Sequence, residues 1–358
     1  MAIKRAITNL PLHYGKAPLW LFSRMKRFSA AIIEIILFEF GPKELLKRLS
    51  DPIWFQALGC AAGFDWHSSG VTTTLCGALK EGLLMLGDDA PVAICGGKAK
   101  RAIETPGEIT VYGDRWGMDV SKFIELSKIC AKIDNCAIQD GYNLYHHTFI
   151  FTKEGDWAVI QQGMNEANRT ARRYQWLSKD GLNLTMEPHT GITCDKTDIV
   201  LNLVAEESSG TQTAIVDFSR QTPDKMVKIW TDMTISMPKR HYITERDFDT
   251  KRLGRIFKTI YEEEPANFEE IMKIKGVGPK TMAALSLVAE LVYEKLPSFK
   301  DPARFSFAHG GKDGHPYPVD RKTYDKTIET LKTCVDKAKL KDREKLDALK
   351  RLAYLNRY

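Results

Sequence analysis

A short segment around residue 276 combines residue types that can bind a phosphate group. It consists of Ile274-Lys275-Gly276-Val277-Gly278-Pro279-Lys280-Thr281. The glycines allow a tight turn with positive φ, and proline suits the first position of a following helix. Amide groups at a helix start have no partner within the helix and lie at the positive end of its dipole, so they can hold a phosphate oxygen. A glycine-rich turn between two packed helices is the plain alternative.

Contacts with phosphate groups position a protein on DNA without reading the base sequence. We therefore predict sequence-independent DNA binding, and the residues of this segment expected to contact DNA are Lys275, Gly276, Val277, Gly278, Lys280 and Thr281. Three basic residues elsewhere in the chain are further candidates for such contacts: Arg172, Arg173 and Lys312. Lys312 lies in a glycine-rich loop that lacks the Gly-x-x-x-x-Gly-Lys-Ser/Thr pattern, so no nucleotide cofactor is expected.

Residues ~267–295 resemble the helix-hairpin-helix of DNA polymerases, ligases, repair nucleases and base-excision glycosylases. In that family the carbonyl groups of the hairpin often hold a monovalent cation that bridges to a phosphate. By position, the resemblance implies that these carbonyls belong to Met272, Ile274 and Val277.

The resemblance to glycosylases also implies a catalytic pair. A lysine just after the hairpin attacks the sugar, and an aspartate in a later Val-Asp string activates it; Lys280 and Asp320 match these positions. The separation between the two residues is longer than usual, and Lys322 replaces the histidine commonly found after the aspartate. The alternative interpretation, which we favour, makes Lys280 a phosphate ligand and Asp320 a helix N-cap.

Polar residues in the first half of the chain indicate a different chemistry. Asp65 and His67 precede an apolar stretch, and His146 and His147 begin a segment of aromatic and β-branched residues. Glu187 and His189 follow further along the chain in a Glu-Pro-His string. Together these side chains could hold a divalent metal ion, Mg or Mn, that activates water for phosphodiester cleavage. No recognised nuclease spacing is present, and for each histidine alone a structural role is the simpler interpretation.

Hydrophobic periodicity predicts the elements that carry these residues. Helices are expected at 20–50, 71–86, 120–132, 247–262, 267–273, 280–295, 319–338 and 341–355. Strands are expected at 92–96, 147–152, 157–162, 199–204 and 214–218. The expected fold class is α+β, with a mixed domain containing a small antiparallel sheet over residues 1–242 and an all-helical helix-hairpin-helix domain over residues 243–358.

Composition limits the function classes. The net charge of +6 and the pI of about 8.8 permit a polyanionic partner without proving one. Seven scattered cysteines without a Cys-x-x-Cys motif favour reduced thiols and an intracellular, cytoplasmic protein. The longest apolar run is too short to span a bilayer, so no membrane association is expected.

Several unusual strings identify a wider resemblance. They are Leu10-Pro11-Leu12-His13, Gly63-Phe64-Asp65-Trp66-His67-Ser68-Ser69-Gly70, Gln161-Gln162-Gly163-Met164-Asn165 and His309-Gly310-Gly311-Lys312-Asp313-Gly314. The whole chain resembles a prokaryotic family, common in archaea, whose domain has no known function.

The hairpin and the candidate metal ligands together predict a DNA-processing enzyme with a role in repair and metal-dependent cleavage. A base-excision glycosylase and a non-catalytic DNA-binding scaffold remain as alternatives.

Overall fold

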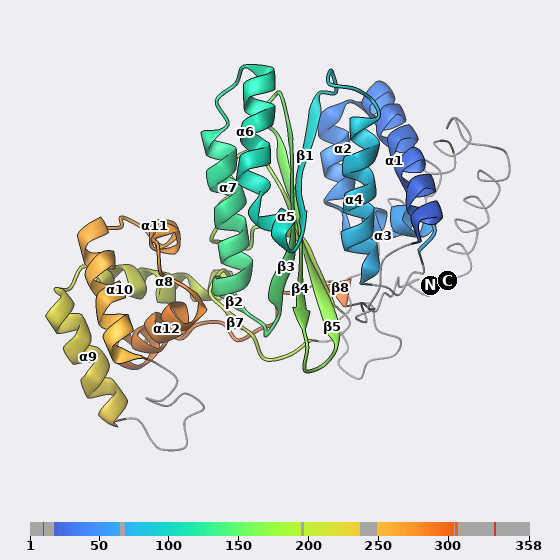
Figure 1. The fold of residues 1–358 in the computed structure, drawn as a ribbon. Helices are drawn as coiled ribbons and strands as arrows, with labels where there is room; N and C mark the ends of the chain where they lie inside the picture. Colours follow the sequence, from blue (N-terminus) through green and yellow to red (C-terminus); the bar gives the residue numbers. More distant parts are fainter. Residues whose placement is uncertain are drawn as a thin grey trace.

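The fold is α+β, as the sequence predicts, with helices on both faces of one sheet and a further group of helices to one side (Figure 1). The structure is a computed structural model. It describes residue 10 and residues 18–64, 69–194, 197–236, 249–303, 305–306 and 333. Within these ranges, no helix is both long and apolar enough to cross a membrane.

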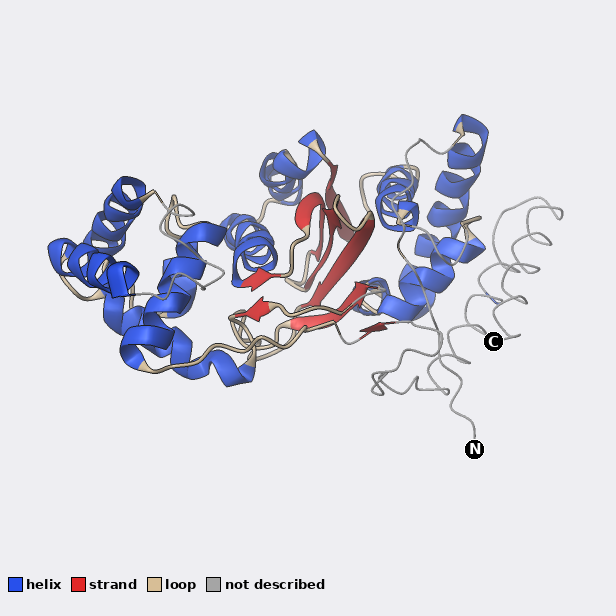
Figure 2. Ribbon diagram, turned by 90° about the horizontal axis from the view of Figure 1, so that it is seen from below, coloured by secondary structure: helices blue, strands red, loops and turns tan. Residues whose placement is uncertain are grey.

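A six-stranded sheet forms the centre of the structure, and Figure 2 shows it between the helices. Its strands, in spatial order, are β1 (Val92–Lys98), β3 (Asn143–Thr152), β4 (Trp157–Asn165), β5 (Thr170–Leu177), β6 (His189–Cys194) and β8 (Phe305–Ser306). The neighbouring pairs from β1 to β6 are antiparallel, and β8 is parallel to β6. This confirms the predicted antiparallel sheet, in which the strands predicted at 147–152 and 157–162 pair with each other as parts of β3 and β4.

Both faces of the sheet are covered, which explains why its central strands are apolar on both sides. The helices on one face are α1 (Leu19–Phe40), α2 (Pro42–Leu49), α3 (Pro52–Ala61) and α4 (Gly70–Leu84). The helices on the other face are α5 (Lys100–Ile103), α6 (Thr105–Trp116) and α7 (Ser121–Lys132). Because side chains alternate along a strand, Ile150 packs towards the first group while Phe149 and Phe151 pack towards the second.

A short irregular region follows α7 and leads into the sheet. It contains a π-helical turn (Ile133–Ala137) and β2 (Ile138–Gln139), which pairs with β7 (Leu201–Asn202). A single 3-10 turn (Glu206–Ser208) comes after β7. These elements lie between the sheet and the group of helices beside it.

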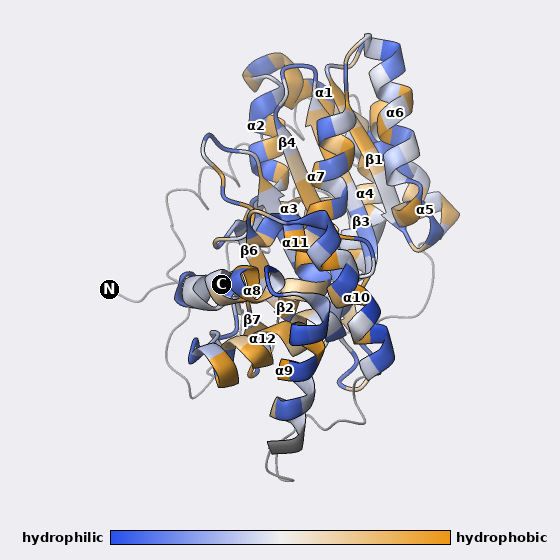
Figure 3. Ribbon diagram, turned by 90° about the vertical axis from the view of Figure 1, so that its left-hand side faces the viewer, coloured by the Kyte–Doolittle hydropathy of each residue, from blue (hydrophilic) through white to orange (hydrophobic). Residues whose placement is uncertain are grey.

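The remaining helices form that group. They are α8 (Ser209–Ser219), α9 (Pro223–Ser236), α10 (Thr250–Glu263), α11 (Phe268–Lys273) and α12 (Pro279–Tyr293). Hydrophobic residues dominate α12, whereas α10 is largely hydrophilic on its outer side (Figure 3). Apolar residues recur at the spacing of one helical face along α10, at Leu253, Ile256, Phe257 and Ile260, and all four are buried.

The predicted domain boundary at residue 242 lies in the segment 237–248, outside the described residues. The helices on its two sides pack together, because α8 contacts α12 and α9 contacts α10. One hydrophobic cluster also continues from the α7 face of the sheet into this group of helices. Packing therefore joins α8 and α9 to the helices that follow them, although both precede the predicted boundary.

One predicted strand is wrong. Residues 214–218 lie inside α8 and not in a sheet. The apolar run is too short to show a period of its own, and it fits a helix that buries Thr211, Ala214, Ile215 and Phe218. The predicted strand at 199–204 is present only as the two residues of β7. The helices predicted at 319–338 and 341–355 fall outside the described residues, apart from residue 333.

Candidate functional site

The turn between α11 and α12, residues 274–278, is open to solvent on its glycine side. Gly276 has φ of +93°, a conformation that side chains rarely adopt. Gly278 is the N-cap residue of the 15-residue α12, no side chain caps this helix, and nothing described lies within 4 Å of where a Cβ would stand on Gly278. Lys275 and Lys280 are exposed, whereas Val277 and Thr281 are buried. The start of α12 is therefore uncovered and has a lysine on each side.

Two side chains from outside the helical group hold this turn. Lys132, at the end of α7, donates a hydrogen bond from Nζ to the carbonyl oxygen of Ile274 at 2.6 Å. Gln139 of β2 donates from Nε2 to the carbonyl oxygen of Pro279 at 2.8 Å. Ile274 provides one of the three carbonyls for which the resemblance implies a monovalent cation, and here a lysine ammonium group contacts it. Burial lowers the pKa of Lys132.

Basic residues of α10 lie next to the turn. Ile256 of α10 comes within 3.9 Å of the Cβ position of Gly276, so this helix passes beside the turn. Arg252 and Arg255 are exposed on α10. Lys273 contributes less charge, because its ammonium group pairs with the carboxylates of Glu125 and Glu269 at 3.0 and 2.8 Å.

Two of the histidines predicted to bind a metal ion are buried on β3. Because neighbouring residues of a strand point to opposite faces, the rings of His146 and His147 do not converge. His147 hydrogen-bonds Ser127 and Gln161, and His146 hydrogen-bonds Thr148. Burial lowers the pKa of both rings, that of His146 to about 3, so both are neutral at ordinary pH. Their environment fits a structural role.

Other predicted site residues cannot be placed. Asp65, His67, Lys312 and Asp320 lie outside the described residues, so the nuclease and glycosylase hypotheses stay predictions. Within the described part of the chain, no group of three or more His, Cys, Asp or Glu side chains could hold a metal ion.

The two adjacent arginines of β5 are buried on opposite faces of the sheet. Arg172 pairs with Asp140 at 3.0 Å and with Asp301 at 2.8 Å. Arg173 donates to Gln56 at 3.0 Å, and its guanidinium group lies 4.7 Å from the ring centre of Phe55. Because the two side chains are only 1% and 0% exposed, their positions argue against the predicted contact with DNA phosphates.

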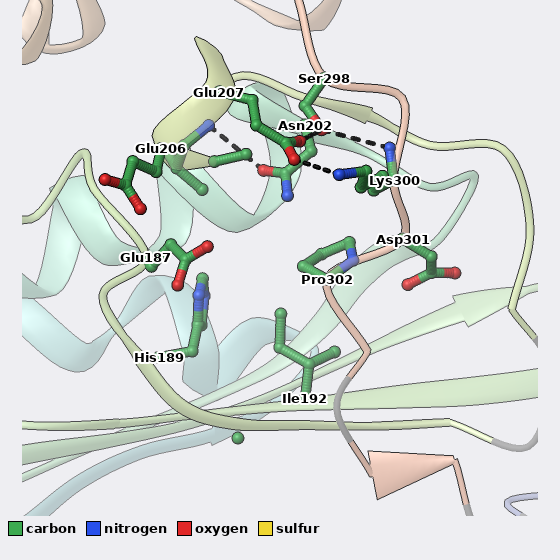
Figure 4. A pocket seen from close by; sticks show the side chains of 13 residues that line it. Glu187, His189, Ile192, Asn202, Glu206, Glu207, Ser298, Lys300, Asp301 and Pro302 are labelled. Atoms are coloured by element: carbon green, nitrogen blue, oxygen red, sulfur yellow. Dashed lines mark hydrogen bonds and ion pairs between the residues drawn. The ribbon is translucent and has the colours of Figure 1, made fainter. Parts of the chain in front are cut away.

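A cavity that the sequence did not predict lies beside β6. It has a volume of about 350 Å³ and lies between β6, the segment 202–207 and the segment 298–302. Figure 4 shows Glu187, His189, Ile192 and Pro302 around its central space. Glu187 has φ of +42°, unusual for a residue with a side chain, and strained backbone of this kind clusters at functional sites.

The histidine of the cavity is held by a buried aspartate. His189 Nε2 lies 2.5 Å from Oδ1 of Asp134, whose side chain is fully buried. Oδ2 of Asp134 accepts hydrogen bonds from Trp176 Nε1 at 3.0 Å and from Gln161 Nε2 at 2.5 Å. Asp134 lies in the π-helical turn, a distortion that is frequent at functional sites. A carboxylate that accepts from an imidazole N–H fixes the orientation of the ring.

A continuous hydrogen-bonded chain runs from this pair into the interior. Gln161 donates to Asp134 through its nitrogen, so its oxygen accepts from Nδ1–H of His147 at 3.0 Å. The other ring nitrogen of His147 must then accept from the hydroxyl of Ser127 at 2.8 Å. Every donor in the chain therefore points towards Asp134. The remaining donor is His189, which must present Nε2–H to Asp134.

Comparison with known proteins assigns the family. The profile of the family described as "Protein of unknown function (DUF763)" matches residues 6–319. The chain belongs to the DUF763 family. This confirms the resemblance to a family of unknown function. No curated protein and no solved structure matches this DUF763 chain.

The Asp134–His189 pair of this DUF763 protein was not predicted from its sequence. The residues are 55 positions apart, and neither belongs to a recognised motif. His189 was grouped with the candidate metal ligands through its Glu-Pro-His string, but Asp134 lies in an ordinary Ile-Asp-Asn string. Only the tertiary structure brings them together.

Proposed function

We propose that this protein binds the backbone of DNA, and that α11, the turn at 274–278 and α12 act as a helix-hairpin-helix. The observation that carries the proposal is the uncovered start of α12. Gly278 has no side chain, and no described residue lies within 4 Å of its Cβ position, so a phosphate oxygen can reach the first amides of the helix.

The charge around the turn supports the same proposal. Lys275 and Lys280 are exposed beside the helix start, and Arg252 and Arg255 are exposed on the neighbouring α10. The ammonium group of Lys132 contacts the turn from behind, through the carbonyl of Ile274. All these groups attract phosphate without reading bases, so the expected binding is independent of sequence and weakens with salt.

The sharpest test is the substitution Gly278→Asp. Aspartate is among the best N-cap residues, and the space at Gly278 is open, so the variant should fold at least as well as the parent. Its carboxylate would occupy the amides that we assign to phosphate, and it would repel the DNA backbone. We expect most of the DNA affinity to be lost, measured by fluorescence anisotropy with two unrelated labelled duplexes at low salt.

A matched control is Gly107→Asp. Gly107 lies in the first turn of α6 and is exposed, and here too no residue that the structure describes lies within 4 Å of the Cβ position. The control makes the same change in charge and should bind both duplexes like the parent. Parental affinity in Gly278→Asp, or an equal loss in Gly107→Asp, would reject the turn as the DNA contact.

A further inference from the structure

A basic loop at the end of β1, residues 98–101, carries three exposed cations. They are the side chains of Lys98, Lys100 and Arg101. Within the described part of the chain, Lys100 alone of the three forms an ion pair, at 3.7 Å with Glu104, and both partners are exposed. Exposed pairs of this kind are weak, so Lys100 can exchange Glu104 for another anion. The basic loop therefore presents concentrated positive charge to the solvent.

The backbone of the basic loop is held in one conformation from behind. The amide of Gly96 donates to the carboxylate of Glu108 at 2.6 Å, and its carbonyl oxygen accepts from Nζ of Lys80 at 3.0 Å. Ala99 has φ of +54°, which is uncommon for a residue with a side chain, and its amide donates to the carbonyl oxygen of Tyr145 at 2.8 Å. Such backbone persists only where its surroundings enforce it. The cations are therefore attached to an ordered backbone, which lowers the entropy cost of binding a partner.

The basic loop lies at the same end of the sheet as the turn at 274–278. Gln139 contacts that turn through the carbonyl oxygen of Pro279. Tyr145, which holds Ala99, is six residues further along the chain, and six residues span at most about 22 Å. Figures 1 and 3 both show α5, which begins within the basic loop, at about the height of α11. One helical turn of DNA, about 34–36 Å long, exceeds this span.

We propose that the basic loop is a second contact with the DNA that the turn at 274–278 binds, so that one duplex lies across both surfaces. Lys98, Lys100 and Arg101 contact phosphate groups and read no bases. This inference rests on the proposed function, because the position of the loop near the turn is what selects DNA over another polyanion, an acidic protein. Two contacts on one duplex bind more tightly than either alone, because the second forms at a high effective concentration.

The test is the triple variant Lys98→Gln/Lys100→Gln/Arg101→Gln, measured by fluorescence anisotropy with a labelled duplex of about 30 base pairs, roughly three helical turns. If each cation neutralises one phosphate, the slope of log affinity against log salt should fall by about 2.7. The charge-conserving variant Lys98→Arg/Lys100→Arg/Arg101→Lys should keep the parental slope. All three side chains are exposed, so both variants should fold, and circular dichroism checks this.

A matched control removes three exposed lysines at the opposite end of the sheet, by Lys43→Gln/Lys47→Gln/Lys179→Gln. Lys43 pairs there with Asp156 at 3.1 Å, beside the turn that joins β3 to β4, and Lys179 follows the end of β5, which pairs with the start of β4. The control changes the net charge by the same amount as the triple variant. It should bind the duplex with the parental slope.

The outcomes separate this inference from the role of the turn. A parental slope in the folded triple variant would overturn the inference whatever Gly278→Asp does, and so would an equal fall in the control. A parental DNA slope together with lost binding of labelled poly-glutamate would assign the basic loop to an acidic protein instead. A fall of the slope in the triple variant, with parental affinity in Gly278→Asp, would keep the basic loop as a DNA contact and reject the turn.

Discussion

Replacing Asp134 with asparagine should keep the fold and reverse the hydrogen-bonding role of His189. The carboxylate accepts from three donors, on Gln161, Trp176 and His189. An asparagine can accept from Gln161 and Trp176 with its oxygen and turn its NH₂ group towards His189. The ring then has to accept at Nε2 and carry its proton at Nδ1, facing the cavity. Gln161 and Trp176 keep their acceptor in this arrangement, and one hydrogen of the NH₂ group donates to His189.

The expected cost of the substitution follows from these three bonds. A hydrogen bond to a charged group contributes about 1.5–3 kcal/mol and a neutral one about 0.5–1.5 kcal/mol, so the loss is roughly 1 kcal/mol for each bond. Removing a buried charge offsets part of the resulting ~3 kcal/mol. Asp134→Ala instead strands all three donors at about 1–3 kcal/mol each, a total that approaches the whole stability of an ordinary domain.

Two measurements check this prediction. Urea unfolding should show a loss of at most about 3 kcal/mol for Asp134→Asn and a much larger one for Asp134→Ala. Nitrogen-15 NMR of the imidazole rings should show the proton of His189 on Nε2 in the parent and on Nδ1 in Asp134→Asn, with His147 unchanged. Equal destabilisation by both substitutions, or a tautomer change at His147 and not at His189, would refute the reasoning.

Three further predictions concern stability and the turn. Arg172→Met should lower the free energy of unfolding, measured in urea, by about 3–5 kcal/mol, because it leaves Asp140 and Asp301 buried without their partner. Adding Asp140→Asn and Asp301→Asn should restore part of this free energy. If the added substitutions restore none of it, unpaired charge is not the cause of the loss. Burial lowers the pKa of His146 to about 3 in the folded state, so only the unfolded chain binds this proton below its ordinary pKa. Unfolding free energy should therefore fall by about 1.4 kcal/mol per pH unit from ~6.5 towards ~3 for this group; His146→Gln should flatten that slope, and an unchanged slope would contradict the assignment. Lys132→Met should weaken DNA binding by about tenfold in fluorescence anisotropy, because the turn loses a hydrogen bond from a charged group, whereas Lys132→Arg should retain most of it; parental affinity in Lys132→Met would contradict this role.

The elements that were predicted correctly are those whose sequence signals lie within the element itself. The β3–β4 hairpin follows from two apolar runs around Gly155, whose φ is +100°. The helices on both sides of the turn follow from hydrophobic periodicity and from Pro279 at the start of α12. In the structure, Asn267 caps α11 by accepting from the amide of Glu270. Such signals lie within a few residues of each other, so they can be recognised without knowing the tertiary structure.

The features that were not predicted from the sequence depend on contacts between residues far apart in the chain. The run from Ala214 to Phe218 is helical because the helical group packs around it, whereas the same residues could also form a strand. Arg172 resembled a surface phosphate ligand, but Asp301, 129 residues away, makes it part of a buried ion pair. The Asp134–His189 pair likewise exists only after the π-helical turn and β6 come together.

The measurement that tests DNA binding by the turn most directly is the salt dependence of affinity in charge-neutralised variants. The double variant Lys275→Gln/Lys280→Gln removes both exposed lysines of the turn. The control Lys43→Gln/Lys47→Gln removes two exposed lysines of α2, on the far side of the sheet. If each turn lysine neutralises one phosphate, the slope of log affinity against log salt should fall by about 1.8 in the first variant, while the control keeps the parental slope. An unchanged slope in the turn variant, or the same fall in both, would contradict the account.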